Sequence, residues 1–157
     1  MARIWFHPYT IEDIQQFKHA NMIHHIGIEF IELGDDYLTG TMPVDERTKQ
    51  TMGILHGGAS VALAETLGSI AANLVVDPGR FACVGLDINA NHIRSVREGA
   101  VTGIAKPVHT GNSTHVWSIE ILDERHRTVC ISRLTMAVLA LEEGKANRNP
   151  FNTLVAK

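Results

Sequence analysis

Cysteine is scarce in this chain of 157 residues, which contains Cys83 and Cys130 and no others. Each cysteine lies inside an apolar run, and neither belongs to a Cys-x-x-Cys or Cys/His spacing of the kind that holds zinc. Free cysteine is among the most buried residue types, so we expect two reduced, buried thiols and no metal site. Reduced thiols fit a reducing compartment, and we therefore expect a cytoplasmic protein.

The sequence also lacks a strong charge of one sign and a segment suited to a membrane. The formal net charge is −3, which gives no reason to expect nucleic acid as a partner. The N-terminal residues contain no apolar stretch of the kind a signal peptide needs. The longest weakly charged run, residues 59–76, barely reaches the length of a membrane span and contains Glu65 and Asn73. We therefore expect no membrane partner.

The distribution of apolar residues, which make up 45% of the chain, predicts one α+β domain. Residues 10–20 have helical spacing, and Thr10 is the expected N-cap. Alternation at residues 26–30 and 37–42 predicts a hairpin. A long helix with almost no charge is expected to end near Val76, ahead of Asp77-Pro78-Gly79. Four further strands are expected at residues 84–91, 99–108, 117–121 and 129–141.

A helix that is apolar around most of its circumference must be covered on more than one side. The economical arrangement is a mostly antiparallel sheet wrapped around that helix. We expect this domain to span residues 1–141. Residues 142–157 are polar and Asn-rich, which favours a surface tail.

Glu65 is the most informative residue, because it is the only charged one between Gly57 and Val76. A carboxylate in a buried helix is unfavourable by several kcal/mol unless it is paired or hydrogen-bonded. It could be structural, either paired with a distant Arg or Lys or extended to reach solvent, or it could be catalytic. Ser69 lies four residues further on and therefore shares its helix face.

The helix that carries Glu65 begins with His56-Gly57-Gly58. Uncovered N–H groups at a helix N-terminus attract negative charge, so they can form an oxyanion hole for a thioester carbonyl. The alternative is that the two glycines only form an ordinary tight turn before the helix. Gly57 and Glu65 are eight residues apart, which is about 12 Å along one helix. Two antiparallel helices related by a dyad would bring both groups to one carbonyl. This chemistry therefore predicts a homodimer with its sites at the interface.

Positively charged residues cluster just after the expected strand at residues 84–91 and on the expected strand at residues 99–108. Arg94, Arg97 and Lys106 lie there, close to His92 and His109. Arginine beside a hydroxyl such as that of Ser95 suits phosphate, although a solvated turn would carry the same residues. The sequence shows no Gly-x-Ser-x-Gly and no Walker loop.

Three segments together resemble the hotdog-fold acyl-CoA thioesterases, in particular the 4-hydroxybenzoyl-CoA and 1,4-dihydroxy-2-naphthoyl-CoA thioesterase branch. The first runs from Met42 to Ser69 and includes Gln50, His56-Gly57-Gly58 and Glu65. The second is Val84-Gly-Leu-Asp-Ile-Asn-Ala-Asn-His-Ile-Arg-Ser95, and the third is Ser132-Arg-Leu-Thr135. The resemblance covers about residues 4–141 and implies the hotdog fold, in which an antiparallel sheet wraps around one long central helix.

The resemblance implies hydrolysis of an aromatic or medium-chain acyl-CoA, with coenzyme A as part of the substrate and no further cofactor. Glu65 would be the general base or nucleophile, and the Gly57 N–H would bind the thioester oxygen. Gln50 and His56 would support that oxygen, and Ser69 would help to place the water. The expected coenzyme A contacts are Gly85, His92, Arg94, Ser95, His109, Gly111, Asn112 and Ser113. The family also implies a homotetramer.

One departure from the branch and two alternative functions remain. Relatives often have Pro-Phe after the glutamine, where this chain has Thr51-Met52, and the flexible Met widens the expected range of acyl groups. A hotdog dehydratase or hydratase could pair His56 with Glu65, although its usual loop before the helix is missing. A non-catalytic acyl-CoA sensor would need a DNA-binding module, for which we expect no spare length.

Overall fold

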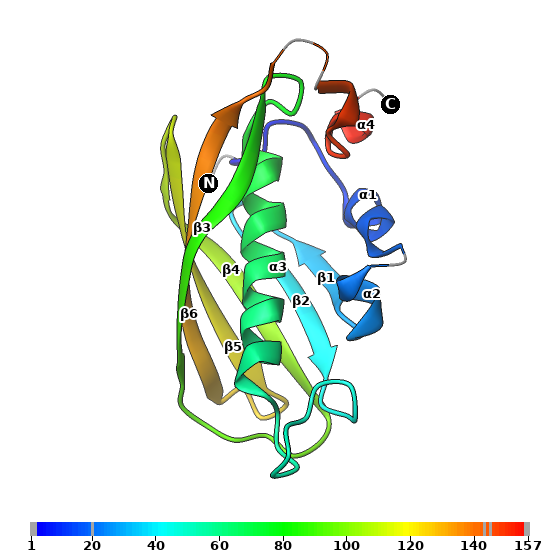
Figure 1. Ribbon diagram of the computed structural model, residues 1–157, viewed down its shortest axis with the longest axis vertical. Coiled ribbons are helices and arrows are strands. Elements are labelled where there is room, and N and C mark those ends of the chain that lie inside the picture. The colour runs from blue at the N-terminus through cyan, green and yellow to red at the C-terminus, as the bar shows by residue number, and fades with distance from the viewer. Residues whose placement is uncertain (1–2, 20, 143, 145, 156–157) are drawn as a thin grey trace.

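The computed structural model describes residues 3–19, 21–142, 144 and 146–155 and forms the α+β architecture that the sequence predicts. One helix, α3 (Gly57–Val75), lies along a six-stranded sheet whose strands follow the order β1-β2-β4-β5-β6-β3 (Figure 1). The strands are β1 (Glu29–Leu33), β2 (Leu38–Pro43), β3 (Phe81–His92), β4 (Ala100–Thr110), β5 (Thr114–Asp123) and β6 (Thr128–Ala140). Neighbouring strands are antiparallel throughout the sheet. This is the hotdog fold.

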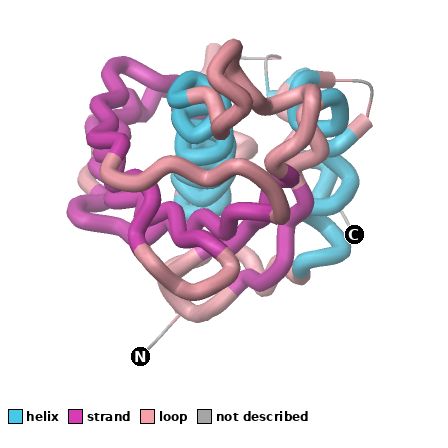
Figure 2. The backbone as a smooth tube through the Cα atoms, turned by 90° about the horizontal axis from the view of Figure 1, so that it is seen from below, coloured by secondary structure: helices cyan, strands magenta, loops and turns pink. Residues whose placement is uncertain are grey.

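The sheet covers α3 on one side only. Seen along the helix, the strands curve around α3 while the smaller helices lie on the other side (Figure 2). Leu63, Leu67 and Leu74 of α3 are fully buried in the core that also contains Trp117 and Ile119 of β5. By length and hydropathy alone α3 could cross a membrane, but 56% of its apolar stretch is buried inside the protein. A core helix of a globular domain has the same length and hydropathy.

The first helical segment is shorter than the expected helix at residues 10–20. It comprises α1 (Ile11–Gln15) and the 3-10 turn η1 (Gln16–Lys18), while Ala20 lies outside the described residues. The Thr10 N-cap is confirmed, because its hydroxyl accepts from the Asp13 N–H and the Asp13 side chain accepts in return. The short helix α2 (Met22–His25) was not predicted from the sequence. The available signal was Asn21, a favourable N-cap residue, whose side chain accepts from the His24 N–H in the structure.

Two strands differ from the expectation because of local backbone geometry. Residues Ile26 and Ile28 are buried as their alternation predicts, but Gly27 has a φ of 74°, so β1 begins only at Glu29. In β3 the register shifts between Gly85 and Asp87. This bulge changes which residues face the core, and Val84 and Leu86 are left 43% and 64% exposed. An apolar sheet edge results, since β3 pairs with β6 alone.

The expectation of a polar surface tail after Leu141 is wrong for residues 146–155. This segment forms η2 (Ala146–Arg148) and α4 (Asn152–Val155) and packs on the core. Leu154 is only 2% exposed, and the Phe151 ring lies 4.5 Å from the ring of Phe17, centroid to centroid. The apolar residues 151, 154 and 155 have helical spacing. This pattern was overlooked because most of the other residues after Leu141 are polar. The domain boundary at residue 141 stays a prediction.

Replacing Leu154 tests whether the C-terminal segment is part of the core. We expect Leu154→Ala to lower the free energy of unfolding by about 2 kcal/mol, since the truncation leaves a cavity in a packed site. Thr153→Ser, which trims an exposed methyl group but keeps the hydroxyl that bonds to the Pro150 carbonyl, should change it by less than about 0.5 kcal/mol. Equal stability of the two variants in urea denaturation would contradict the packing of this segment.

Both cysteines are free and buried, which confirms the expectation drawn from their apolar surroundings. Burial raises the pKa of the Cys83 thiol to about 12 and also raises the pKa of Cys130. The pKa implies that on the order of one Cys83 thiol in ten thousand is ionised at pH 8. Neither residue is therefore suited to act as a nucleophile at neutral pH.

We expect both thiols of the folded protein to react slowly with a thiol reagent at pH 8. The rate should rise as the pH approaches the raised pKa values, because only the thiolate reacts. Denaturation in guanidinium should expose two fast-reacting thiols per chain. Stoichiometric labelling of the native protein within seconds would show that the thiols are accessible, contrary to the structure.

Candidate functional site

The first turn of α3 leaves one backbone donor free. His56 is the N-cap, and its Nδ1 accepts a hydrogen bond of 2.8 Å from the Gly58 N–H. The Gly57 N–H has no acceptor among the described residues. A β-carbon on Gly57 would lie 2.8 Å from Nε2 of His92, so the exposed His92 ring lies directly against this glycine. The result is an uncovered N–H at the positive end of a long helix.

This amide opens into a cavity of about 320 Å³. Five of the predicted site residues line it together, namely Gln50, Gly57, His92, Arg94 and Ser95. The loop before α3 is held in place by backbone bonds from Leu55 to Val96 and from His56 to Thr48, each 2.8 Å long. The side-chain oxygen of Gln50 accepts from the Met52 N–H, which leaves its amide N–H₂ group as a donor toward the cavity.

The structure places Glu65 on the side of α3 that the sheet does not cover. Its side chain is exposed because the sheet wraps only one side of the helix, so in the single chain the carboxylate reaches solvent, which was one of the alternatives that the sequence left open. The carboxylate forms no hydrogen bond or ion pair with any described residue. It rests against β3, where a β-carbon on Gly85 would lie 3.0 Å from Oε1 of Glu65. Gly85 therefore adjoins the acid rather than the His92 cluster.

Ser69 follows Glu65 on the next turn of the same face and is half-buried. Its hydroxyl makes one weak contact, at 3.7 Å, with the sulfur of Met136. The hydroxyl thus keeps hydrogen-bonding capacity for a ligand or a water molecule.

The remaining predicted contacts lie at the opposite end of α3. Gly111 and Asn112, in the turn from β4 to β5, line a second cavity of about 470 Å³ together with Val75, Val76 and Asp77. The His109 ring packs against the same turn, where a β-carbon on Gly111 would lie 2.5 Å from its Nε2. The predicted Ser113 follows in this turn, and its carbonyl accepts from the Val138 N–H. Within one chain, the expected coenzyme A residues other than Gly85 therefore form two groups separated by the length of α3, about 27 Å.

Two buried polar residues near these clusters escaped the sequence analysis. Asn73 bridges α3 to β3, because its side chain bonds to both the N–H and the carbonyl of Cys83. Its position eight residues after Glu65 was the available signal. His115 lines the second cavity with an unpartnered Nδ1, and burial, aided by nearby His109, lowers the pKa of its imidazole. No cluster of metal-ligating side chains occurs among the described residues.

Comparison with known proteins identifies relatives along most of the chain. The family model described as "Thioesterase superfamily" matches residues 52–130. The 1,4-dihydroxy-2-naphthoyl-CoA hydrolase of Escherichia coli is 52% identical over 87% of this chain and 99% of its own. The proofreading thioesterase EntH of Cronobacter turicensis is 47% identical over 87% of this chain and 98% of its own.

A crystal structure of a thioesterase from Haemophilus influenzae superimposes with a TM-score of 0.86 at 46% identity, covering 90% of this chain and 99% of that one. A mutant thioesterase from Pseudomonas aeruginosa also has a TM-score of 0.86, at 45% identity, and covers 88% of this chain and 99% of that one. Sequence and fold therefore agree over nearly the same length. The chain belongs to the thioesterase superfamily and is a thioester hydrolase with the hotdog fold.

Proposed function

We propose that the protein hydrolyses an aromatic or medium-chain acyl-CoA thioester to the free acid and coenzyme A, at sites shared by two subunits. The proposal rests on two groups of one helix that have no partner within the described residues. One is a backbone hydrogen-bond donor and the other is a carboxylate. Among the described residues, neither the Gly57 N–H at the start of α3 nor the Glu65 carboxylate halfway along it has a hydrogen-bond or ion-pair partner. Acyl transfer needs a donor for the developing oxyanion and a carboxylate beside the carbonyl carbon.

The reaction needs only protein groups and water. The Gly57 N–H polarises the thioester carbonyl, and the amide of Gln50 lies in the same cavity to orient the acyl-CoA. Glu65 either takes a proton from water that attacks the carbonyl carbon, or attacks that carbon directly to give an anhydride that water then cleaves. In both routes the C–S bond breaks, and coenzyme A leaves as a thiol after it gains a proton. Ser69, one turn further along the same face of α3, would hold the attacking water.

Thioester hydrolysis is favoured over a dehydratase pairing of His56 with Glu65. A second subunit that brings Gly57 to Glu65 would also bring its neighbour His56, so the distinction rests on the bonding of the ring. Nδ1 of His56 is occupied by the Gly58 N–H, which assigns this ring to capping the helix. The relatives described above are named as thioesterases or hydrolases.

A second copy of the chain completes the proposed site. The apolar edge of β3, with Val84 and Leu86 exposed, offers a strand for pairing to another β3 across a dyad. Such pairing would cover the open side of α3 and bring the helix start of one subunit toward Glu65 of the other. It would also bring together the two coenzyme A clusters, which one chain holds at opposite ends of α3. Exposed Ile131 and Val108 offer apolar surface for the further association into a tetramer.

The positive residues beside the first cavity support binding of the nucleotide part of coenzyme A. Arg94 and Ser95 line that cavity, and a guanidinium with a hydroxyl suits phosphate oxygens. Met52 is 74% exposed in the single chain, in keeping with a side chain that contacts an acyl group or a partner subunit. The two buried, free thiols support the expected cytoplasmic location.

Removing the carboxylate of Glu65 should abolish most hydrolysis and leave substrate binding. We expect Glu65→Gln to lower kcat by about 10²- to 10⁴-fold, the usual contribution of a positioned acid or base, with a small change in affinity for acyl-CoA. Release of free coenzyme A, followed with a thiol reagent, measures the reaction. Glu12→Gln, which removes an exposed carboxylate from α1, is the control. Wild-type rates for Glu65→Gln would rule out the assigned role.

Gly57→Pro removes the proposed oxyanion donor with little disturbance of the helix. Gly57 is the first helical residue, where proline is tolerated, and His56 has the extended conformation that proline prefers before it. We expect kcat to fall by about 10²- to 10³-fold, as on loss of one oxyanion-hole donor. Gly57→Ala adds the same β-carbon near His92 but keeps the N–H, so it should retain much more activity.

Heterodimers of Glu65→Gln and Gly57→Pro subunits show whether the two groups act across the interface. If they do, each heterodimer has one site with both wild-type groups and one with neither. Doubly tagged heterodimers should then recover about half of the wild-type activity although both parents are inactive. Heterodimers as inactive as their parents would place Glu65 and Gly57 of one site in the same subunit.

A further inference from the structure

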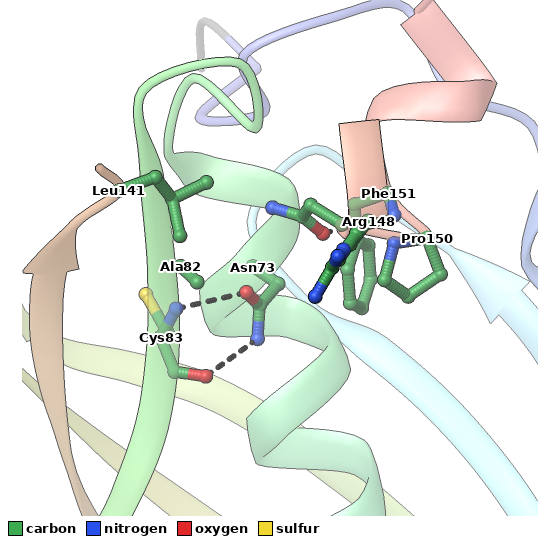
Figure 3. A pocket seen from close by; sticks show the side chains of 8 residues that line it. Asn73, Ala82, Cys83, Leu141, Arg148, Pro150 and Phe151 are labelled. Atoms are coloured by element: carbon green, nitrogen blue, oxygen red, sulfur yellow. Dashed lines mark hydrogen bonds between the residues drawn. The ribbon is translucent and has the colours of Figure 1, made fainter. Parts of the chain in front are cut away.

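The side chain of Asn73 bonds to the backbone of β3 as a neighbouring strand would. Its oxygen accepts from the Cys83 N–H at 2.9 Å, and its amide donates to the Cys83 carbonyl at 3.0 Å (Figure 3). The same amide also donates to the Ser69 carbonyl, at 2.9 Å, which fixes the side chain to α3 itself. Asn73 is only 7% exposed, so these bonds are shielded from water.

The backbone groups that Asn73 binds belong to the free edge of the sheet. Cys83 is paired with Val138 of β6, and the Val138 N–H donates to the Ser113 carbonyl, on the side of β6 that faces β5. Directly opposite residues of an antiparallel pair point their N–H and C=O groups either toward each other or both away. Val138 points away from β3, so Cys83 points away from β6, toward the edge that no strand of this chain covers. Asn73 therefore caps this edge at Cys83.

The chain itself closes the other end of the free edge. β3 ends at His92, and the next two N–H groups along the chain both donate to the Val129 carbonyl of β6. Two consecutive N–H groups directed to one acceptor end the alternation that a partner strand needs. The edge that is open to a second β3 therefore runs from residue 84 to His92, and its middle residue is Ile88.

The shared site of the proposed function requires nearly the same midpoint. Within one chain Glu65 rests against Gly85, while Gly57 lies against the ring of His92. If the partner subunit's Gly57 is to meet Glu65, the partner subunit's His92 must lie opposite Gly85. The dyad then passes midway between positions 85 and 92, which is within one residue of the middle of the free edge. The extent of the edge and the alignment of the site therefore agree.

We propose that Asn73 is a positioning residue that sets the register of β3 against the partner subunit's β3. This proposal rests on the proposed function, because the register acts through the alignment of Gly57 with Glu65. The smallest slip that keeps both helices on the same face of the joined sheet is two residues, about 7 Å along the strand. A slip toward the start of β3 would have to use the edge groups of Cys83, which Asn73 occupies. A slip of that size would part the oxyanion donor from the carboxylate.

Cysteines introduced on the outer face of β3 report this register in the intact protein. Asp87, Asn89 and Asn91 are exposed, whereas the two native thiols are buried, so disulfide cross-linking between subunits reflects the introduced residue. We expect Asn89→Cys, which lies beside the dyad, to cross-link about tenfold faster or more than Asn91→Cys under mild oxidation. Equal rates at these two positions would overturn the register.

Asn73→Ala frees the edge groups of Cys83 and should let the partner strand slip toward the start of β3. We expect the ratio of the Asp87→Cys to the Asn89→Cys cross-linking rate to rise about tenfold, and kcat to fall about tenfold or more. Leu74→Ala is the matched control, because it truncates a fully buried neighbour on the same helix whose side chain forms no hydrogen bonds. It should lower thermal stability while the cross-linking ratio stays within about twofold.

Asn73→Asp decides the question if Asn73→Ala does not form dimers. Aspartate keeps the acceptor for the Cys83 N–H but loses the donor to the Cys83 and Ser69 carbonyls, so the ratio should rise in the same direction. An unchanged ratio in a protein whose hydrolysis depends on Glu65 overturns this proposal alone, whereas hydrolysis that is unaffected by Glu65→Gln overturns the proposed function.

Discussion

The packing of α3 against the concave face of the sheet determines what the rest of the molecule can do. Leu63, Leu67 and Leu74 are fully buried beneath the helix, so α3 is held rigidly along its length. This fixes the Gly57 N–H at one level and the Glu65 carboxylate about 12 Å further along. A rigid helix cannot bring its own first turn to its own middle. The chemistry of both groups on one carbonyl therefore requires two helices.

The same one-sided packing explains the exposed features of the single chain. Glu65 lies against Gly85 of β3, and the exposed apolar residues Val84 and Leu86 flank this glycine along the edge strand. A free strand edge with apolar side chains is unfavourable to leave exposed to water. A second subunit that covers this side would bury the edge and place the acid in a closed site, where its charge interactions are stronger.

The long helix, most strands and the residues of the first cavity could be predicted from the sequence. The apolar spacing of residues 57–75 and the Asp77-Pro78-Gly79 stop define α3, and the Thr10 cap locates α1. The resemblance named Gln50, Gly57, His92, Arg94 and Ser95, which the structure brings to one cavity. The exposure of Glu65 could not be predicted, because composition does not reveal which side of a helix the sheet leaves open. The bulge after Gly85, the short α2 and the packing of Phe151 and Leu154 also depend on local geometry that alternation and average polarity do not reveal.

The most direct test of the shared site is a crystal structure of the Glu65→Gln protein with an acyl-CoA bound. We expect the thioester oxygen to lie about 3 Å from the amide nitrogen of the partner subunit's Gly57, while the carbonyl carbon faces residue 65 of the first subunit. An acyl-CoA whose carbonyl is bound away from residue 65, or by Gly57 and residue 65 of the same chain, would contradict this expectation.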